Sequence, residues 1–248
     1  KIVTSKRTKP KIYKSNYKNL EFKNFLSEEE CIFIIRDSHP RLKPAGVIAK
    51  DKDGVVNHIP SKIRTNYLTS YVPNFAGDDI SDEDITDYLK TKKEINSKIM
   101  NFFSEVTKVP IENLEYPLQV LQYLDGELSD TGNGEYYKAH HDFFHKTDDI
   151  YWKNNVIDSG GQRNWSAIIY LNEVVEGGET YYPSINLNIK PETGKIVFHK
   201  NCDETSKELE EGGGLIHESL HEARPVIKGE KWVLVIWSRI RKYEERII

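Results

Sequence analysis

From Leu118 onward the sequence is a series of short β-favouring runs separated by turn residues. The runs span residues 118–124, 136–143, 165–171, 179–182, 186–189, 195–199, 214–217, 224–227 and 231–240. Glycine, asparagine, aspartate or proline marks most of the gaps between them. Many short strands with this punctuation favour a β-sandwich or a barrel. The second half of the chain is therefore expected to form a β core.

The first half of the chain carries two helix signals. Ser27 and Glu30 form a capping box, and the helix that they begin is expected to end near Ser38. A second helix is predicted over residues 82–108, where apolar side chains recur at helical spacing. Residues 40–80 lie between the two helices and are rich in glycine and proline. We expect this region to be a mobile loop that orders when a substrate binds.

The length of 248 residues fits one large domain. Within it we expect a basic extended arm over residues 1–18, a helical flank and mobile loop region over 19–115, and the β core over 116–242. The net charge of −4 gives no reason to expect nucleic acid as a partner. No apolar run approaches the ~18 residues of a membrane helix, so no membrane contact is expected from this segment. The chain begins at Lys1, so we expect a trimmed N-terminus. Its cellular location is therefore left open between the secretory-pathway lumen and the cytoplasm.

The candidate chemistry begins with His140 and Asp142, which lie two residues apart in a predicted strand. Alternate residues of a strand share a face, so these two side chains point the same way and His141 points the other way. An imidazole and a carboxylate supply two corners of a metal site, and a third ligand must come from elsewhere. His221 and His217 are the candidates. Two histidines and one carboxylate are the ligands with which non-haem Fe(II) keeps coordination positions open.

Four motifs follow one another in the second half of the chain. They are Tyr137-x-x-His140-x-Asp142, Gly177-Gly178-Glu179-Thr180, Ser219-Leu220-His221, and Gly229-Glu230-Lys231-Trp232. In their order and spacing they resemble the prolyl 4-hydroxylases, which are Fe(II)- and 2-oxoglutarate-dependent dioxygenases. The resemblance implies an α+β fold, with a double-stranded β-helix (jelly roll) core flanked by N-terminal helices.

The resemblance also implies an activity, which is hydroxylation of peptidyl proline at C4. This reaction uses Fe(II), O₂ and 2-oxoglutarate, and it releases succinate and CO₂. Ascorbate is implied as a reductant, and a proline-containing peptide or protein as the partner. The Ser-Leu-His match selects His221 over His217, so the implied metal ligands are His140, Asp142 and His221.

Lys231, Tyr123 and Thr180 are implied to bind the distal carboxylate of 2-oxoglutarate. A dicarboxylate inside an apolar barrel needs a buried cation, because an unpaired buried charge is very costly. Strand alternation places Lys231 on the same face as Val233 and Val235. The residue pattern and the resemblance therefore agree on Lys231.

Tyr137, Arg163 and Trp237 correspond to family positions that line the peptide channel. Flat, rigid aromatic rings suit a proline ring, and an arginine can hold a peptide carbonyl. The Arg64-Thr65 segment resembles a family segment on the same side of the site.

Three other functions are considered. A 2-oxoglutarate oxygenase could hydroxylate another residue or a free amino acid, although collagen-type lysyl hydroxylases typically carry arginine at the position of Lys231. A non-catalytic jelly-roll binding module would have no use for both the triad and this lysine. A Zn²⁺ hydrolase does not usually have this ligand layout.

Overall fold

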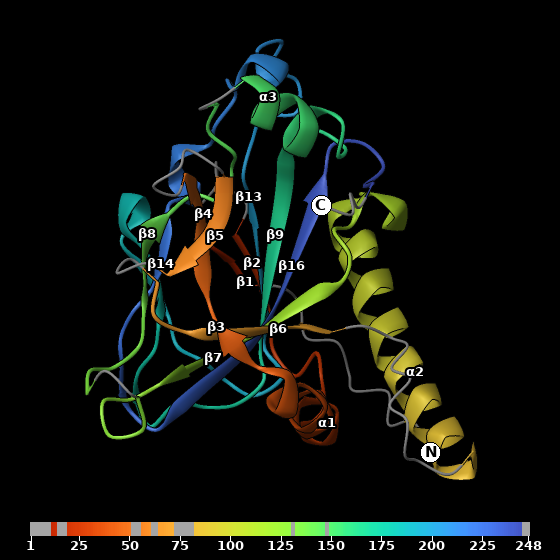
Figure 1. The fold of residues 1–248 in the computed structure, drawn as a ribbon, viewed down its shortest axis with the longest axis vertical. Helices are drawn as coiled ribbons and strands as arrows, with labels where there is room; N and C mark the ends of the chain where they lie inside the picture. The colour runs from red at the N-terminus through yellow and green to blue at the C-terminus, as the bar shows by residue number, and fades with distance from the viewer. Residues whose placement is uncertain are drawn as a thin grey trace.

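A computed structural model describes residues 11–13, 19–50, 56–60, 64–71, 82–129, 132–146 and 149–244. Within these residues the largest unit is an eight-stranded sheet (Figure 1). In spatial order its strands are β1 (Lys11–Tyr13), β2 (Asn19–Phe22), β13 (Ile196–Lys200), β9 (Arg163–Tyr170), β16 (Glu230–Arg239), β7 (Leu118–Leu124), β6 (Tyr67–Tyr71) and β3 (Lys43–Pro44).

A second, four-stranded sheet packs against one face of the large sheet. Its order is β12 (Leu187–Ile189), β11 (Thr180–Tyr182), β14 (His221–Ala223) and β8 (Tyr137–His140). Two further strand pairs are β4 (Gly46–Lys50) with β5 (Val56–Pro60), and β10 (Glu176–Gly177) with β15 (Val226–Lys228). The strand pairs in the two main sheets are antiparallel, which agrees with the predicted jelly-roll core.

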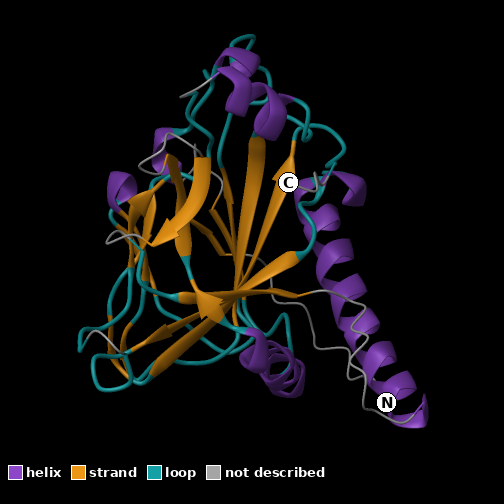
Figure 2. Cartoon of the chain, in the orientation of Figure 1, coloured by secondary structure: helices purple, strands orange, loops and turns teal. Residues whose placement is uncertain are grey.

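The helices lie on the other side of the large sheet. They are α1 (Glu28–Ser38) and α2 (Asp82–Thr107), and Figure 2 shows both of them away from the small sheet. A short helix, α3 (Asp149–Trp152), stands at one end of the sheets, and single helical turns lie at His39–Arg41, Ile111–Asn113, Lys153–Ile157, Pro183–Ile185, Leu209–Glu211 and His217–Ser219. Among the described helices, none combines the length and hydropathy needed to cross a bilayer.

The predicted capping box of α1 is present. The Ser27 hydroxyl accepts a hydrogen bond from the Glu30 amide at 3.2 Å, and the Glu30 carboxylate accepts one from the Ser27 amide at 2.8 Å. Two amides at the helix start are satisfied reciprocally, which explains why the helix begins there. Both predicted helices are confirmed to within one residue of their expected ends.

Strand β16 separates two hydrophobic cores. Trp232, Leu234 and Ile236 belong to the core beneath α1 and α2, whereas Val233 and Val235 belong to the core between the two sheets. This division follows from the two-residue period of a strand. Lys231 is two residues before Val233, and its Nζ faces Tyr123 and Tyr170 of the second core, which agrees with the predicted alternation.

Strands that precede residue 116, the predicted start of the β core, also belong to the sheets. Three such strands join the large sheet: β2 pairs with β13, β6 pairs with β7, and β3 pairs with β6. Each pairing satisfies backbone N–H and C=O groups that would otherwise lack partners. The expected mobile region 40–80 thus contributes sheet strands, and its residues 51–55, 61–63 and 72–80 lie outside the described residues. Of the expected basic arm, β1 pairs with β2, and residues 1–10 and 14–18 lie outside the described residues.

Candidate active site

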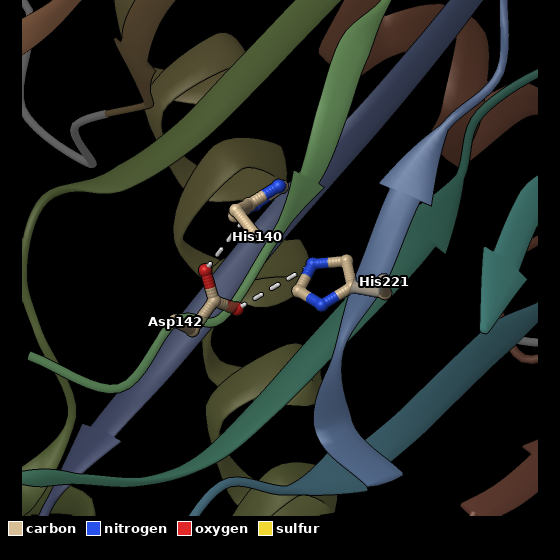
Figure 3. Close-up of side chains that lie close together, drawn as sticks. All are labelled: His140, Asp142 and His221. Atoms are coloured by element: carbon tan, nitrogen blue, oxygen red, sulfur yellow. Dashed lines mark ion pairs between the residues drawn. The ribbon is translucent and has the colours of Figure 1, made fainter. Parts of the chain in front are cut away.

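The small sheet brings His140 and His221 side by side. Strands β8 and β14 are antiparallel neighbours, and His140 lies directly opposite His221 in their register. Asp142 follows two residues after His140 (Figure 3). One ligand atom from each of these three side chains lies within 4.8 Å of the other two. Together they form the metal cluster, which is the term used below.

Asp142 reaches the metal cluster by a route that strand alternation does not describe. The expected strand over 136–143 ends at His140, and Asp142 lies in the bend that follows. Its position is fixed from the large sheet instead. The Ser166 hydroxyl donates to Asp142 Oδ2 at 2.7 Å, and the Asn201 amide donates to the Ser166 hydroxyl at 2.8 Å. The prediction placed this carboxylate correctly beside His140 but gave the wrong local cause.

Backbone carbonyls fix the tautomers of both histidines. His140 Nδ1 lies 2.8 Å from the Lys138 carbonyl oxygen, and His221 Nδ1 lies 2.9 Å from the Ser219 carbonyl oxygen. Because a carbonyl can only accept, each Nδ1 carries the proton. Each Nε2 then presents a lone pair. These Nε2 atoms lie 3.8 Å (His140) and 3.9 Å (His221) from the Asp142 carboxylate.

The electrostatics of the metal cluster suit a divalent cation. Burial lowers the pKa of His140 and lowers that of His221 well below its ordinary value, so both imidazoles are neutral near pH 7. Burial alone would raise the pKa of Asp142, but the neighbouring His199 side chain, followed by His221, His140 and Arg163, holds it well below its ordinary value. Two neutral imidazoles and one ionised carboxylate form the donor set of a non-haem Fe(II) site. The residues present therefore fit this metal.

The other histidines named at the sequence level lie elsewhere. His141 has its ring centroid 5.9 Å from that of His145 and 6.4 Å from that of His217. None of these three belongs to the metal cluster, which is the arrangement that the sequence predicted.

Lys231 is buried in the space between the two sheets. Its side chain is 1% exposed, and Nζ lies 5.2 Å from the ring centroid of Tyr123 and 5.8 Å from that of Tyr170. Burial lowers its pKa to about 7, and the charge of Glu179 only partly opposes this shift. In the described part of the chain, no carboxylate comes within ion-pair distance of Nζ. The site therefore holds a buried cation that lacks an anionic partner.

Tyr123 and Thr180 lie on opposite sides of this space. Tyr123 is 3% exposed and pairs with Lys231 across β7 and β16. Thr180 lies on β11, opposite Ala223 of β14, and its hydroxyl accepts a hydrogen bond from the Tyr170 hydroxyl at 2.7 Å. Sequence reasoning did not name Tyr170. Its two-residue spacing from Ile168 in a buried strand was the signal that could have found it.

The three side chains predicted on the peptide side lie in two groups. Tyr137 stacks on His140, with ring centroids 3.7 Å apart, and the Arg64 guanidinium lies 4.9 Å from the Tyr137 ring. Arg163 lies 4.0 Å from the ring centroid of Trp237. Tyr137 therefore borders the metal cluster directly.

The Arg163 guanidinium is already paired with a residue that sequence reasoning missed. Its Nε and Nη2 donate to the two oxygens of Glu115, each at 2.7 Å. Phe144 lies 4.7 Å away, as measured from its ring centroid to the guanidinium carbon. Arg239 forms a second ion pair with Glu115. Glu115 precedes the β core in sequence, and no local pattern marks it as a partner of Arg163.

Comparison with known proteins identifies the family of this chain. Residues 118–239 match the model of the 2OG-Fe(II) oxygenase superfamily. A putative prolyl 4-hydroxylase of Acanthamoeba polyphaga mimivirus is 36% identical over 137 residues, which cover 54% of this chain and 49% of that protein. The probable prolyl 4-hydroxylase 8 of Arabidopsis thaliana is 30% identical over 234 residues, which cover 90% of this chain and 68% of that protein.

Solved structures share the fold. The viral collagen prolyl hydroxylase of Paramecium Bursaria Chlorella virus-1, in its 2OG complex, superposes with a TM-score of 0.54 at 22% identity, covering 88% of this chain and 94% of that one. A prolyl hydroxylase of Trichoplax adhaerens, in complex with a hypoxia inducible factor peptide fragment, gives a TM-score of 0.51 at 14% identity, covering 89% and 83%. From the identity to the plant relative and the superfamily match, this chain belongs to the prolyl 4-hydroxylase family of Fe(II)- and 2-oxoglutarate-dependent oxygenases.

Proposed function

We propose that this chain hydroxylates peptidyl proline at C4, using Fe(II), O₂ and 2-oxoglutarate, with residues 1–248 acting as one catalytic domain. The observation that carries the proposal is the buried Lys231 ammonium, which lies beside Tyr123 and Tyr170 in the core between the sheets and has no anionic partner among the described residues. Tyr137 and Tyr182 of the same core contact His140 and His221. A buried cation of this kind is costly unless an anion binds to it. A metal-binding dicarboxylate satisfies both groups at once.

His140, Asp142 and His221 would hold the Fe(II). When bound, the metal and 2-oxoglutarate supply the oxidising chemistry, in which one oxygen atom of O₂ enters succinate and the other enters the prolyl ring. The contribution of the protein is to bind and orient the reactants. Its neutral imidazoles stay available as ligands because Lys138 and Ser219 hold their Nδ1 protons.

Lys231, Tyr123 and Thr180 would bind the distal carboxylate of 2-oxoglutarate. The Lys231 ammonium supplies the charge, and the two hydroxyls supply directed hydrogen bonds. Tyr170 already donates to the Thr180 hydroxyl, so the Thr180 proton is left to donate to a ligand. Tyr170 is thus a positioning residue for this end of the site.

Tyr137, Arg163 and Trp237 would line the peptide side. Glu115 holds the Arg163 guanidinium against the Trp237 ring, which leaves Nη1 of Arg163 to donate to a peptide carbonyl. Tyr137 stacks on His140 and so lies at the boundary between the peptide and the metal cluster. Rigid aromatic surfaces suit the flat face of a proline ring.

The names of the relatives support a prolyl substrate, since the mimivirus and plant proteins are described as prolyl 4-hydroxylases. Of the two solved structures, one is named a collagen prolyl hydroxylase and the other is a complex with a hypoxia inducible factor peptide fragment. Both collagen-like repeats and peptides with a single proline are therefore substrates to test. Ascorbate is proposed as the reductant that restores Fe(II), by analogy with the family.

The test is mass spectrometry of proline-containing peptides after incubation with the protein, Fe(II), ascorbate and 2-oxoglutarate. The panel should include collagen-like repeats and peptides with a single proline, and matched peptides with lysine replacing proline. We expect one added oxygen atom on proline, identified as 4-hydroxyproline by amino-acid analysis, with release of succinate. Oxygen on lysine or on a free amino acid would overturn the proline assignment. Absence of succinate and of any product would overturn the proposed activity.

A further inference from the structure

His199 is a third buried histidine beside Asp142. It lies on β13 of the large sheet and is 0% exposed. Its Nε2 lies 3.6 Å from Asp142 Oδ2, and its ring centroid is 4.6 Å from that of His221. Its two-residue spacing from Val197, which faces the core between the sheets, turns its side chain toward the metal cluster. Nevertheless, the metal cluster does not include it.

The two ring nitrogens of His199 have different surroundings. Nδ1 lies 3.0 Å from the Tyr182 hydroxyl oxygen, and Tyr182 is itself fully buried. Nε2 is buried and has no hydrogen-bond partner in the part of the chain that the structure describes, because the 3.6 Å to Asp142 exceeds hydrogen-bond length. A buried polar nitrogen without a partner is destabilising, because it has lost its hydrogen bonds to water and gained none in return. Such a group therefore needs an explanation.

The neighbouring charge decides which tautomer His199 adopts. A lone pair on Nε2 would face an ionised carboxylate and be repelled, whereas an N–H there is attracted. The Tyr182 hydroxyl can donate to Nδ1, which leaves the proton on Nε2. A movement of less than ~1 Å by either side chain would bring Nε2 within the 2.7–3.2 Å range of a hydrogen bond to Asp142.

The same carboxylate oxygen already accepts from Ser166. Oδ2 of Asp142 thus has two donors directed at it, Ser166 at 2.7 Å and His199 at 3.6 Å, both from the large sheet. Oδ1 faces His140 of the small sheet. His221 Nε2 lies 3.9 Å from Oδ2. The donors on Oδ2 hold the carboxylate in one orientation and keep Oδ1 turned toward His140, where it is available to bind a metal.

We propose that His199, held by Tyr182, is a positioning residue that orients Asp142 for metal binding through an N–H donated to Oδ2. Its role is to keep the carboxylate in a single rotamer, with Oδ1 toward the metal. Partners of this kind typically change metal affinity by about 10–100-fold when they are removed. The inference rests on metal binding by the metal cluster, which is part of the proposed function, but it does not depend on which substrate is hydroxylated.

The test is the affinity of the metal-free protein for Mn(II), measured from the electron paramagnetic resonance signal of free aqueous Mn(II). His199→Phe fills the space but removes the donor, so we expect the dissociation constant to rise about tenfold or more. His199→Gln places an amide N–H near the position of Nε2, so it should recover most of the affinity. Tyr182→Phe should raise the dissociation constant by a smaller factor, because Nδ1 loses the group that fixes the tautomer.

The control is His217→Gln, since His217 is exposed and its ring lies outside the metal cluster. It should bind Mn(II) as the wild-type protein does. Near-ultraviolet circular dichroism checks that each variant is folded. If His199→Phe does not fold, the Mn(II) affinity of Tyr182→Phe is compared with that of the wild type instead. An unchanged affinity in Tyr182→Phe would then overturn the proposal.

Several results would overturn the proposal. One is an Mn(II) affinity in His199→Phe equal to that of the wild type. Another is an equally low Mn(II) affinity in His199→Gln and His199→Phe, which would indicate that His199 acts through packing. X-ray absorption of the Co(II) protein that counts three imidazoles would make His199 a ligand instead of a donor. A wild-type protein that binds no Mn(II) would also overturn it, whatever the hydroxylation assay gives.

Discussion

The two main sheets differ in what their strands bury. In the large sheet, β9 and β16 have 8 and 10 residues, and nearly all of them are buried on both faces. In the small sheet, β8, β11, β12 and β14 have three or four residues each, and at most two residues of each strand are buried. Yet the small sheet carries His140 and His221. Stability therefore comes mainly from one sheet, and two of the three metal-cluster side chains come from the other.

This difference has a physical reason. A site that must bind a metal and meet a peptide needs an accessible edge, and His140 lies on the edge strand β8 of the small sheet. Short strands bury too little apolar surface to be stable alone. The large sheet supports them through polar side chains that cross the interface. Ser166 donates to Asp142 and itself accepts from Asn201, and Tyr170 donates to Thr180. Lys231 also comes from the large sheet, so it belongs to both regions of the comparison.

The largest effect on activity is expected at the metal cluster. Asp142→Ala should abolish turnover, because one of three metal ligands is lost. Its free energy of unfolding should stay close to that of the wild type or rise, since an ionised buried carboxylate is removed along with its hydrogen bond. Paired assays of peptide hydroxylation and urea unfolding test this, with the exposed Glu218→Ala as a control. A large loss of stability would mean that the metal cluster also holds the fold together.

The largest effect on stability is expected in the large sheet. Trp232→Ala should cost about 3–5 kcal/mol of unfolding free energy, because Trp232 is 1% exposed and lies in the core beneath the helices. Tyr181→Ala, an aromatic truncation in the small sheet, should cost much less, because Tyr181 is only half-buried. Urea unfolding followed by circular dichroism compares the two variants. Equal losses would contradict the division of roles between the sheets.

Substitutions of Lys231 test the residue that connects the large sheet with the site. If it binds the distal carboxylate, Lys231→Ala breaks a buried ion pair worth about 3–5 kcal/mol, so the KM for 2-oxoglutarate should rise by roughly two to three and a half decades. Mn(II) affinity should change little, because the metal ligands are intact. Lys231→Arg should restore activity only partly, since a planar guanidinium replaces a compact ammonium. An unchanged KM in Lys231→Ala would remove the co-substrate assignment.

The smallest effect concerns pH. The pKa of Lys231 is about 7 in the protein, against an ordinary value of 10.5, so the free protein loses the ammonium proton as the pH rises through 7. A dicarboxylate needs that proton, and its affinity should fall by about tenfold per pH unit above 7, until the pKa of the complex is reached. Calorimetry at pH 8 in buffers of different ionisation enthalpy should record uptake of about one proton. If the wild-type protein takes up no proton, or if Lys231→Met takes up the same number, the predicted protonation of Lys231 on binding is contradicted.

The same shift gives a stability prediction of definite sign. Because the folded pKa lies below the unfolded one, the unfolded chain binds more protons between pH 7 and 10.5, and stability should rise with pH across that window. Lys231→Met should flatten this part of the curve and raise the melting temperature below pH 7, since it removes a buried charge that no described carboxylate pairs with. Thermal unfolding without 2-oxoglutarate measures both effects.

The sequence by itself determined the features that depend on local spacing. The capping box at Ser27 begins α1, and the two-residue period of β16 directs Lys231 into the space between the sheets. Motif order was enough to name His140, Asp142 and His221, which the structure brings within 4.8 Å of one another. These features can be read locally because backbone geometry sets the periods of helices and strands.

Only the tertiary structure decided which distant groups hold those residues in place. Asp142 is positioned by Ser166 from another sheet, not by its own strand, and Arg163 is paired with Glu115, 48 residues earlier in the chain. His199 and Tyr170 sit in apolar strands, where the sequence shows a buried side chain but not its partner. Hydrogen bonds between sheets depend on how the sheets pack. No local period encodes that packing, because it results from contacts summed over the whole chain.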